Sequence, residues 1–140
     1  MNDRSIAIAK LIMKQLDSAE DGKSSQAISD TVSREMINLA FQNILQREAS
    51  EQEQQRLVSY GSRMIQYHHQ KDAVIKEYPT QITRSLVEEF TGRPFEYEEI
   101  LPVFENYEQD TKAHQVSEQV RALADICLIL FNTNEFIYVE

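Results

Sequence analysis

The strongest hydrophobic pattern in the sequence lies near the C-terminus, between Ser117 and Val139. Apolar residues recur there at steps of three and four, and the second half of the run is apolar on almost every side: Val120, Leu123, Ala124, Ile126, Cys127, Leu128, Ile129, Leu130 and Phe131. Ser117 is a favourable N-cap, and Asn132 is a residue type that ends helices in the left-handed conformation. A helix that is apolar nearly all round must be covered by other elements. The pattern therefore predicts a central helix from Ser117 to Phe131.

A short extended tail is expected after this helix. Phe136 and Tyr138 are two residues apart, so in an extended chain their side chains point to the same side. Two aliphatic residues alternate with them and point to the other side. We expect Phe136 to pack against the helical core near the first or second helix, while Asn134 and Glu135 fix the turn before the tail.

Helical spacing of apolar residues also predicts the rest of the chain to be α-helical. The expected helices cover residues 3–16, 29–46, 50–69, 80–90 and 96–103, with a polar linker at 17–29. The third of these opens with a capping box, in which Ser50 is followed three residues later by Glu53. The predicted fold class is all-α: residues 1–140 form a single compact bundle of five to six helices around the apolar C-terminal helix.

The charge balance excludes several classes of partner. The 140 residues include 14 Lys and Arg and 23 Asp and Glu, which gives a net charge of −9. Nucleic-acid backbones and anionic membranes need clustered positive charge, so neither is an expected partner. No apolar run reaches the length of about 18 residues that a membrane span requires. The first residues, M-N-D-R-S, show no signal peptide.

The residues that carry chemistry form no recognisable catalytic arrangement. Cys127 is the only cysteine and has apolar neighbours, so we expect a buried thiol rather than a nucleophile. His68 and His69 diverge by about 100° on a helix and do not share a metal ion. Asp125 is expected at the surface or as a cap rather than as the partner of a histidine. We therefore expect no catalytic residue, no metal ligand and no cofactor in this chain.

An acidic stretch from Glu88 to Asp110 contains eight carboxylates and a single base, Arg93. One reading is a cation site or a docking face for a basic partner. The stretch lacks the ordered oxygen ligands and the glycine turn of a calcium loop. A solvated acidic surface is therefore the favoured reading.

Four stretches of the sequence carry a family resemblance. They are F-Q-N-I-L-Q-R-E-A-S-E-Q-E at 41–53, V-E-E-F-T-G-R-P-F-E-Y at 87–97, L-P-V-F-E-N-Y-E-Q-D-T-K-A-H-Q-V-S at 101–117 and R-A-L-A-D-I-C-L-I-L-F-N-T-N-E-F-I-Y-V at 121–139. Together they resemble the C-terminal domain of unknown function found in planctomycete cytochrome-associated multidomain proteins. The resemblance extends from Asn2 to Val139, although the family usually has Pro-Thr where Ala49 and Ser50 stand.

The resemblance implies that the chain is the last part of a larger exported protein, and hence exported or periplasmic. Family members often carry a second uncharacterised domain before this region, and sometimes a c-type cytochrome domain. The implied partners are these preceding domains, and the family supplies no catalytic residue to carry over. Its recurring residues are the expected interaction residues: Asn132, Asn134, Glu135, Phe136 and Tyr138.

The sequence therefore favours a non-catalytic structural or interaction domain at the C-terminus of a larger exported protein, in some members a cytochrome-containing one. An alternative from another class is an accessory domain whose acidic residues complete a substrate- or cation-binding cleft of the parent chain. A stand-alone cytosolic adaptor is a third reading.

Overall fold

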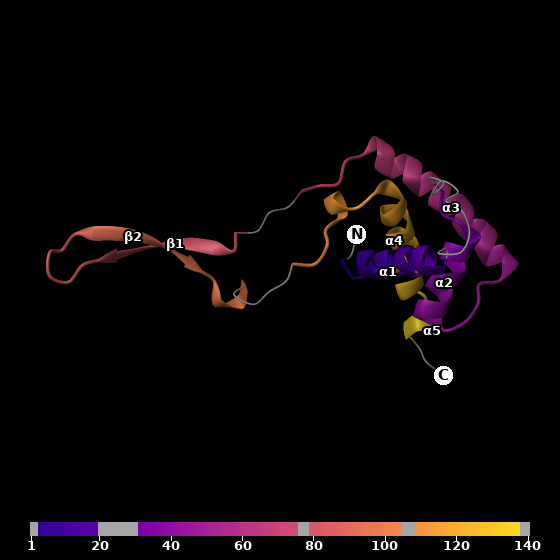
Figure 1. Cartoon of the computed structure of the whole chain (residues 1–140), viewed down its shortest axis with the longest axis horizontal. Helices are drawn as coiled ribbons and strands as arrows, with labels where there is room; N and C mark the ends of the chain where they lie inside the picture. Colours follow the sequence, from indigo (N-terminus) through magenta and orange to yellow (C-terminus); the bar gives the residue numbers. More distant parts are fainter. Residues whose placement is uncertain (1–2, 20–30, 76–78, 105–108, 138–140) are drawn as a thin grey trace. The chain divides into compact units, whose positions relative to one another are not determined.

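The computed structural model describes residues 3–19, 31–75, 79–104 and 109–137, and the chain divides into two compact units. The helical unit comprises Met1–Val74 and Asp110–Glu140, and the hairpin unit comprises Ile75–Gln109. The helices are α1 (Asp3–Ala19), α2 (Arg34–Leu45), α3 (Glu51–Gln70), α4 (Glu118–Phe131) and α5 (Asn134–Ile137). The strands are β1 (Gln81–Val87) and β2 (Pro94–Ile100), and short 3-10 helices cover Pro102–Phe104 and Ala113–Gln115 (Figure 1).

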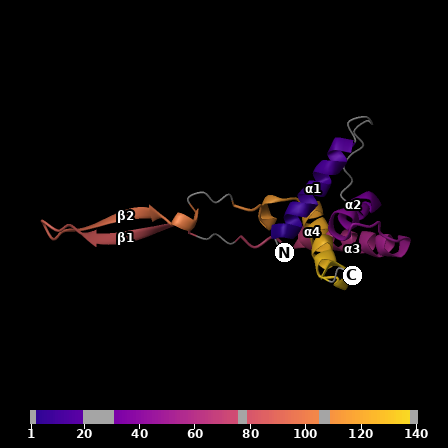
Figure 2. The same ribbon diagram turned by 90° about the horizontal axis from the view of Figure 1, so that it is seen from below.

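The core of the helical unit forms where α4 packs against α1, α2 and α3. The α4 helix begins after Ser117, whose side chain accepts a hydrogen bond from the backbone N–H of Val120. Side chains from the helices and from the segment before α2 share one buried cluster: Ile6, Ala9, Ile12, Val32, Met36, Ile37, Ala40, Phe41, Ile44, Ala122, Leu123, Ala124, Ile126, Cys127 and Leu130. Figures 1 and 2 show α4 beside α1 from two directions. The apolar pattern of α4 is thus satisfied by contacts on most of its sides.

Gly61, in the middle of α3, is a point of close approach rather than a simple weakness in the helix. A Cβ atom at Gly61 would lie 2.8 Å from the Cβ of Val32 and 3.4 Å from the Cδ1 of Ile126. Both neighbours belong to the buried core. Only glycine lets α3 come this close to the segment that leads into α2.

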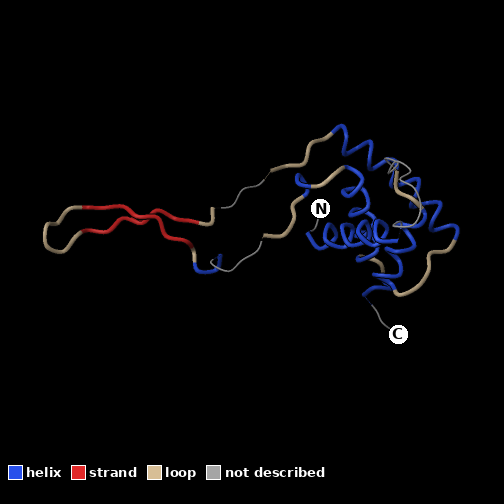
Figure 3. The backbone as a smooth tube through the Cα atoms, viewed as in Figure 1, coloured by secondary structure: helices blue, strands red, loops and turns tan. Residues whose placement is uncertain are grey.

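The hairpin unit contradicts the all-α prediction, because β1 and β2 form an antiparallel two-stranded sheet. The helices expected at 80–90 and 96–103 do not form, and only Pro102–Phe104 is helical there. The alternation of Phe95, Glu96 and Tyr97 fits the two-residue repeat of a strand better than the repeat of a helix. Gly92 adopts a φ of 64° in the connection, which glycine tolerates without steric cost. Figure 3 shows the two strands crossing in projection, as expected of a twisted ribbon. The fold is therefore mixed.

The end of the chain also differs from the predicted extended tail. Residues Asn134–Ile137 form α5, a single helical turn. Asn132 has a φ of −99° rather than a left-handed conformation, and its side-chain amide donates to the carbonyl of Leu128 at 2.7 Å. The carbonyl of Thr133 then accepts hydrogen bonds from the first N–H groups after Glu135. Backbone bonding therefore continues through the corner, and Tyr138 lies outside the described residues.

Replacing Leu123 by alanine should destabilise the helical unit by roughly 2–5 kcal/mol, through lost burial and a residual cavity. Leu123 is fully buried, whereas Ile129, on the same helix, is 41% exposed. Ile129→Ala is therefore the matched control and should cost less than about 1 kcal/mol. Urea denaturation followed by circular dichroism measures both. Equal losses in the two variants would contradict the described packing of α4.

Gly61→Ala should also destabilise the protein, although alanine favours a helix by about 1 kcal/mol over glycine at an open position. The new methyl group would overlap Val32, so either the helix or the preceding segment must shift. Ser59→Ala, at an exposed position two residues earlier, is the control and should be nearly neutral. A rise in melting temperature for Gly61→Ala would show that Val32 does not pack against α3.

Candidate functional site

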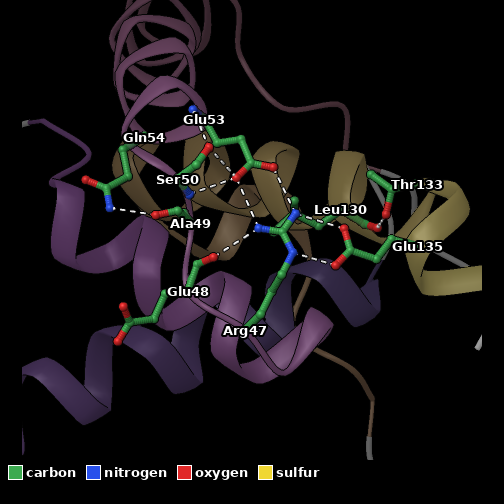
Figure 4. Close-up of polar contacts among 9 residues, drawn as sticks. All are labelled: Arg47, Glu48, Ala49, Ser50, Glu53, Gln54, Leu130, Thr133 and Glu135. Atoms are coloured by element: carbon green, nitrogen blue, oxygen red, sulfur yellow. Dashed lines mark hydrogen bonds and ion pairs between the residues drawn. The ribbon is translucent and has the colours of Figure 1, made fainter.

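Arg47 joins the α2–α3 connection to the C-terminal corner through two carboxylates (Figure 4). Its Nη1 and Nη2 atoms donate to the two oxygens of Glu53 at 3.1 and 2.9 Å. Its Nη2 also donates to Glu135 Oε2 at 2.8 Å, while Nε donates to Glu135 Oε1. Both contacts are therefore bidentate, which fixes the guanidinium plane as well as its position.

The local sequence places each member of this Arg47 cluster, which we define as Arg47, Glu53 and Glu135. Gln46 follows the last residue of α2 in the left-handed conformation, with a φ of 56°, so the chain turns before Arg47. Ser50 caps α3, and its backbone N–H donates to Glu53 Oε2 at 2.8 Å. The expected capping box is thus confirmed. Its glutamate, Glu53, also accepts hydrogen bonds from Arg47. Sequence reasoning missed Arg47 itself, whose only local signal is its place just before that box.

The electrostatics of the cluster favour the charged form of all three groups. Hydrogen bonds from Arg47, opposed by partial burial and aided by Ser50, lower the pKa of Glu53 to about 2. Arg47 also lowers the pKa of Glu135. Hydrogen bonds from Glu135 and then Glu53 raise the pKa of Arg47 above its ordinary value of 12.5. The three side chains are 36–45% exposed, so solvent screens the contacts, but their shared geometry fixes the corner.

The expected interaction residues have different roles at this corner. Glu135 belongs to the Arg47 cluster, while Asn132 bonds the α4 backbone and Asn134 is exposed at the start of α5. The ring of Phe136 packs edge-on against Phe131 of α4, with centroids 5.2 Å apart, and its helix α5 also contacts α2, the second helix. The structure therefore brings Glu135 and Phe136 into intramolecular contacts.

A second polar contact links α3 to α4. The Nε2 atom of His68 lies 2.7 Å from Asp125 Oδ2, and the two side chains are 10% and 18% exposed. Asp125 is thus the partner of a histidine, contrary to its expected surface or capping role. Tyr67 packs edge-on against the His68 ring. His69 is exposed and does not join this pair. The contact orients one imidazole and holds two helices together.

An open pocket of about 660 Å³ lies between α3 and α4. It is lined by Gln52, Gln55, Arg56, Leu57, Ser59, Tyr60, Arg63 and Ile129. Burial, and then the nearby charge of Asp125, raises the pKa of Tyr60 above its ordinary value of 10. The lining of the pocket therefore combines cationic, neutral polar and apolar side chains.

The carboxylates of the acidic stretch do not converge on one site within the described residues. Glu88 accepts a hydrogen bond from Thr91, and Glu99 pairs with Arg84. Glu96 and Glu98 lie on the face of the hairpin opposite to Glu99. Residues 105–108 lie outside the described part of the chain. No group of three metal-ligating side chains occurs in the part of the chain that the structure describes.

In comparisons with known proteins, no family model, no curated protein and no solved structure matches this chain. None of the helices within the described ranges is long and apolar enough to cross a membrane.

The Arg47 cluster predicts a loss of stability in acid. The folded pKa of Glu53, about 2, lies below its ordinary value of 4.5, so the unfolded chain takes up the proton first. The stabilisation is complete above pH 4.5 and is lost as the pH falls towards 2. Glu53→Gln should therefore flatten the fall in stability over this window, as measured by urea denaturation at several pH values. Glu51→Gln, at an exposed position in the same helical turn, should keep the native profile.

Cys127 should react slowly with thiol reagents in the folded protein. Its side chain is fully buried, and burial raises the pKa of the thiol to about 12, so little thiolate is present at neutral pH. The rate of reaction with a chromogenic disulfide should rise steeply when urea unfolds the chain. Fast labelling of the native protein would contradict the buried position.

Proposed function

We propose that this chain is a non-catalytic structural or interaction domain at the C-terminus of a larger exported protein. One observation supports this most: the titratable groups that meet in the helical unit hold its own helices together. Arg47, Glu53 and Glu135 join the α2–α3 connection to α5, and the His68–Asp125 pair joins α3 to α4. Charges used in this way make a rigid scaffold on which a contact surface can be presented.

The proposed contact surface is the corner formed by the end of α4 and by α5. Its apolar side chains are open to solvent: Ile129 is 41% exposed, Phe136 42% and Ile137 58%. The Arg47 cluster holds α5 in place before any partner arrives, which lowers the ordering cost of binding. An apolar patch on a preceding domain of the parent chain is the partner that this corner suits.

The family resemblance supports the same reading. The residues that recur in the planctomycete cytochrome-associated C-terminal domains include Glu135 and Phe136, which build this corner. The proposal extends to their setting: an exported parent protein, in some members a cytochrome-containing one, whose earlier domains meet this one. The haem chemistry of such a parent would belong to its other domains.

The test begins with the reading frame that encodes this chain. The polypeptide encoded upstream is produced separately and titrated with the chain by isothermal titration calorimetry. We expect binding that Ile137→Ser weakens at least about tenfold, since a buried aliphatic side chain contributes roughly 1.5–3 kcal/mol. Val74→Ser, at a position 73% exposed in the same unit, is the control and should bind like the native chain. An upstream frame without a domain, or equal affinities for both variants, would overturn the proposal.

A further inference from the structure

One face of the two-stranded sheet is largely apolar, and no other described part of the hairpin unit covers it. In an antiparallel pair, residues opposite one another lie on the same face. The register pairs Ile82 with Glu99, Arg84 with Tyr97 and Leu86 with Phe95, so these six residues share what we call the apolar face. Leu86 is 50% exposed, Phe95 47% and Tyr97 37%, and the two aromatic rings lie side by side at 6.2 Å. An isolated two-stranded hairpin is only marginally stable in water, so packing of another surface against this face would stabilise it.

The charges of the hairpin are divided unequally between its two faces. The opposite face carries the carboxylates of Glu96 and Glu98, for which no ion pair occurs among the described residues, beside Thr83 and Ser85. The apolar face carries one positive and one negative group, Arg84 and Glu99, which form an ion pair across the strands. The apolar face is therefore electrically neutral, although the whole chain has a net charge of −9.

We propose that a second copy of this chain covers the apolar face, with the two hairpins packed face to face about a two-fold axis. A two-fold contact requires a surface that complements itself. A neutral face with one cation and one anion meets this requirement, because Arg84 of each copy can lie against Glu99 of the other. An acidic or a basic partner would instead leave one of the two charges opposed by its own sign.

The division of charge also keeps the repulsion between copies small. Sheets that pack face to face lie about 10 Å apart, and Glu96 and Glu98 point away from the contact. Their repulsion acts over more than the screening length of about 8 Å at physiological ionic strength. Each strand has seven residues and is about 24 Å long, so the contact falls at the weak end of specific interfaces, below about 1,200 Å².

This inference uses residues of the hairpin unit alone and stands independently of the proposed function, whose test depends on the corner of α4 and α5. Loss of binding to upstream domains would leave the dimer unaffected, and a monomeric chain would leave that binding unaffected.

Sedimentation velocity over a range of concentrations tests the proposal with two neighbouring residues that point to opposite faces. Leu86→Ser removes an apolar side chain from the proposed contact and should weaken the dimer at least about tenfold. Val87→Ser removes one that is 60% exposed on the other face and should leave the dimer unchanged. A native chain that stays monomeric at every concentration overturns the proposal. A dimer that both variants weaken equally, or that neither weakens, also overturns it.

A charge exchange keeps the test decisive if Leu86→Ser disturbs the hairpin itself. Arg84→Glu gives a face with two negative charges, and Glu99→Arg gives a face with two positive charges, so each variant alone should be monomeric. An equimolar mixture should form a one-to-one heterodimer, because opposite charges then meet across the contact. Two variants that remain monomeric when mixed, while the native chain dimerises, would show that the faces do not meet.

Discussion

The burial of α4 is the interaction on which the rest of the helical unit depends. Three other helices contribute side chains to its surroundings, and its central residues Leu123, Ile126 and Cys127 are shielded completely from water. A hydrophobic contact of this kind is non-directional, so it brings the helices together without fixing how they lie. Specific contacts fix the relative positions of the helices. Gly61 lets α3 come close to Val32 and Ile126, and the His68–Asp125 pair aligns α3 with α4.

The Arg47 cluster is another specific contact, and it fixes the chain after the C-terminal end of α4. The guanidinium of Arg47 binds the carboxylate of Glu53, near the N-terminus of α3, and that of Glu135, 88 positions along the chain from Arg47. Exposed ion pairs contribute little free energy one by one. Two bidentate contacts on one planar group nevertheless restrict direction as well as distance, so the corner is held in one arrangement.

Parts of this structure could be predicted from the sequence because they depend on nearby residues. Ser50 and Glu53 are three positions apart, and their capping box follows from that spacing. The hairpin was missed although Phe95 and Tyr97 alternate with glutamates, because seven-residue runs with few apolar positions satisfy a helical repeat nearly as well. The contact between Arg47 and Glu135 has no local pattern at all, since only the packed core brings those segments together. Asn132 ends α4 without the left-handed conformation, and its side-chain amide donates to the carbonyl of Leu128 one turn back.

The division of the helical unit into two stretches of sequence has a consequence for synthesis in the cell. The α1, α2 and α3 helices are complete by Gln70, but α4, which fills the space among them, begins only at Glu118. Ribosomes add about 5–20 residues per second, so the nascent chain waits on the order of seconds with its future core uncovered. During that interval the apolar sides of three helices face the solvent or a chaperone. The hairpin unit lies between the two stretches, so its synthesis delays the completion of the helical core.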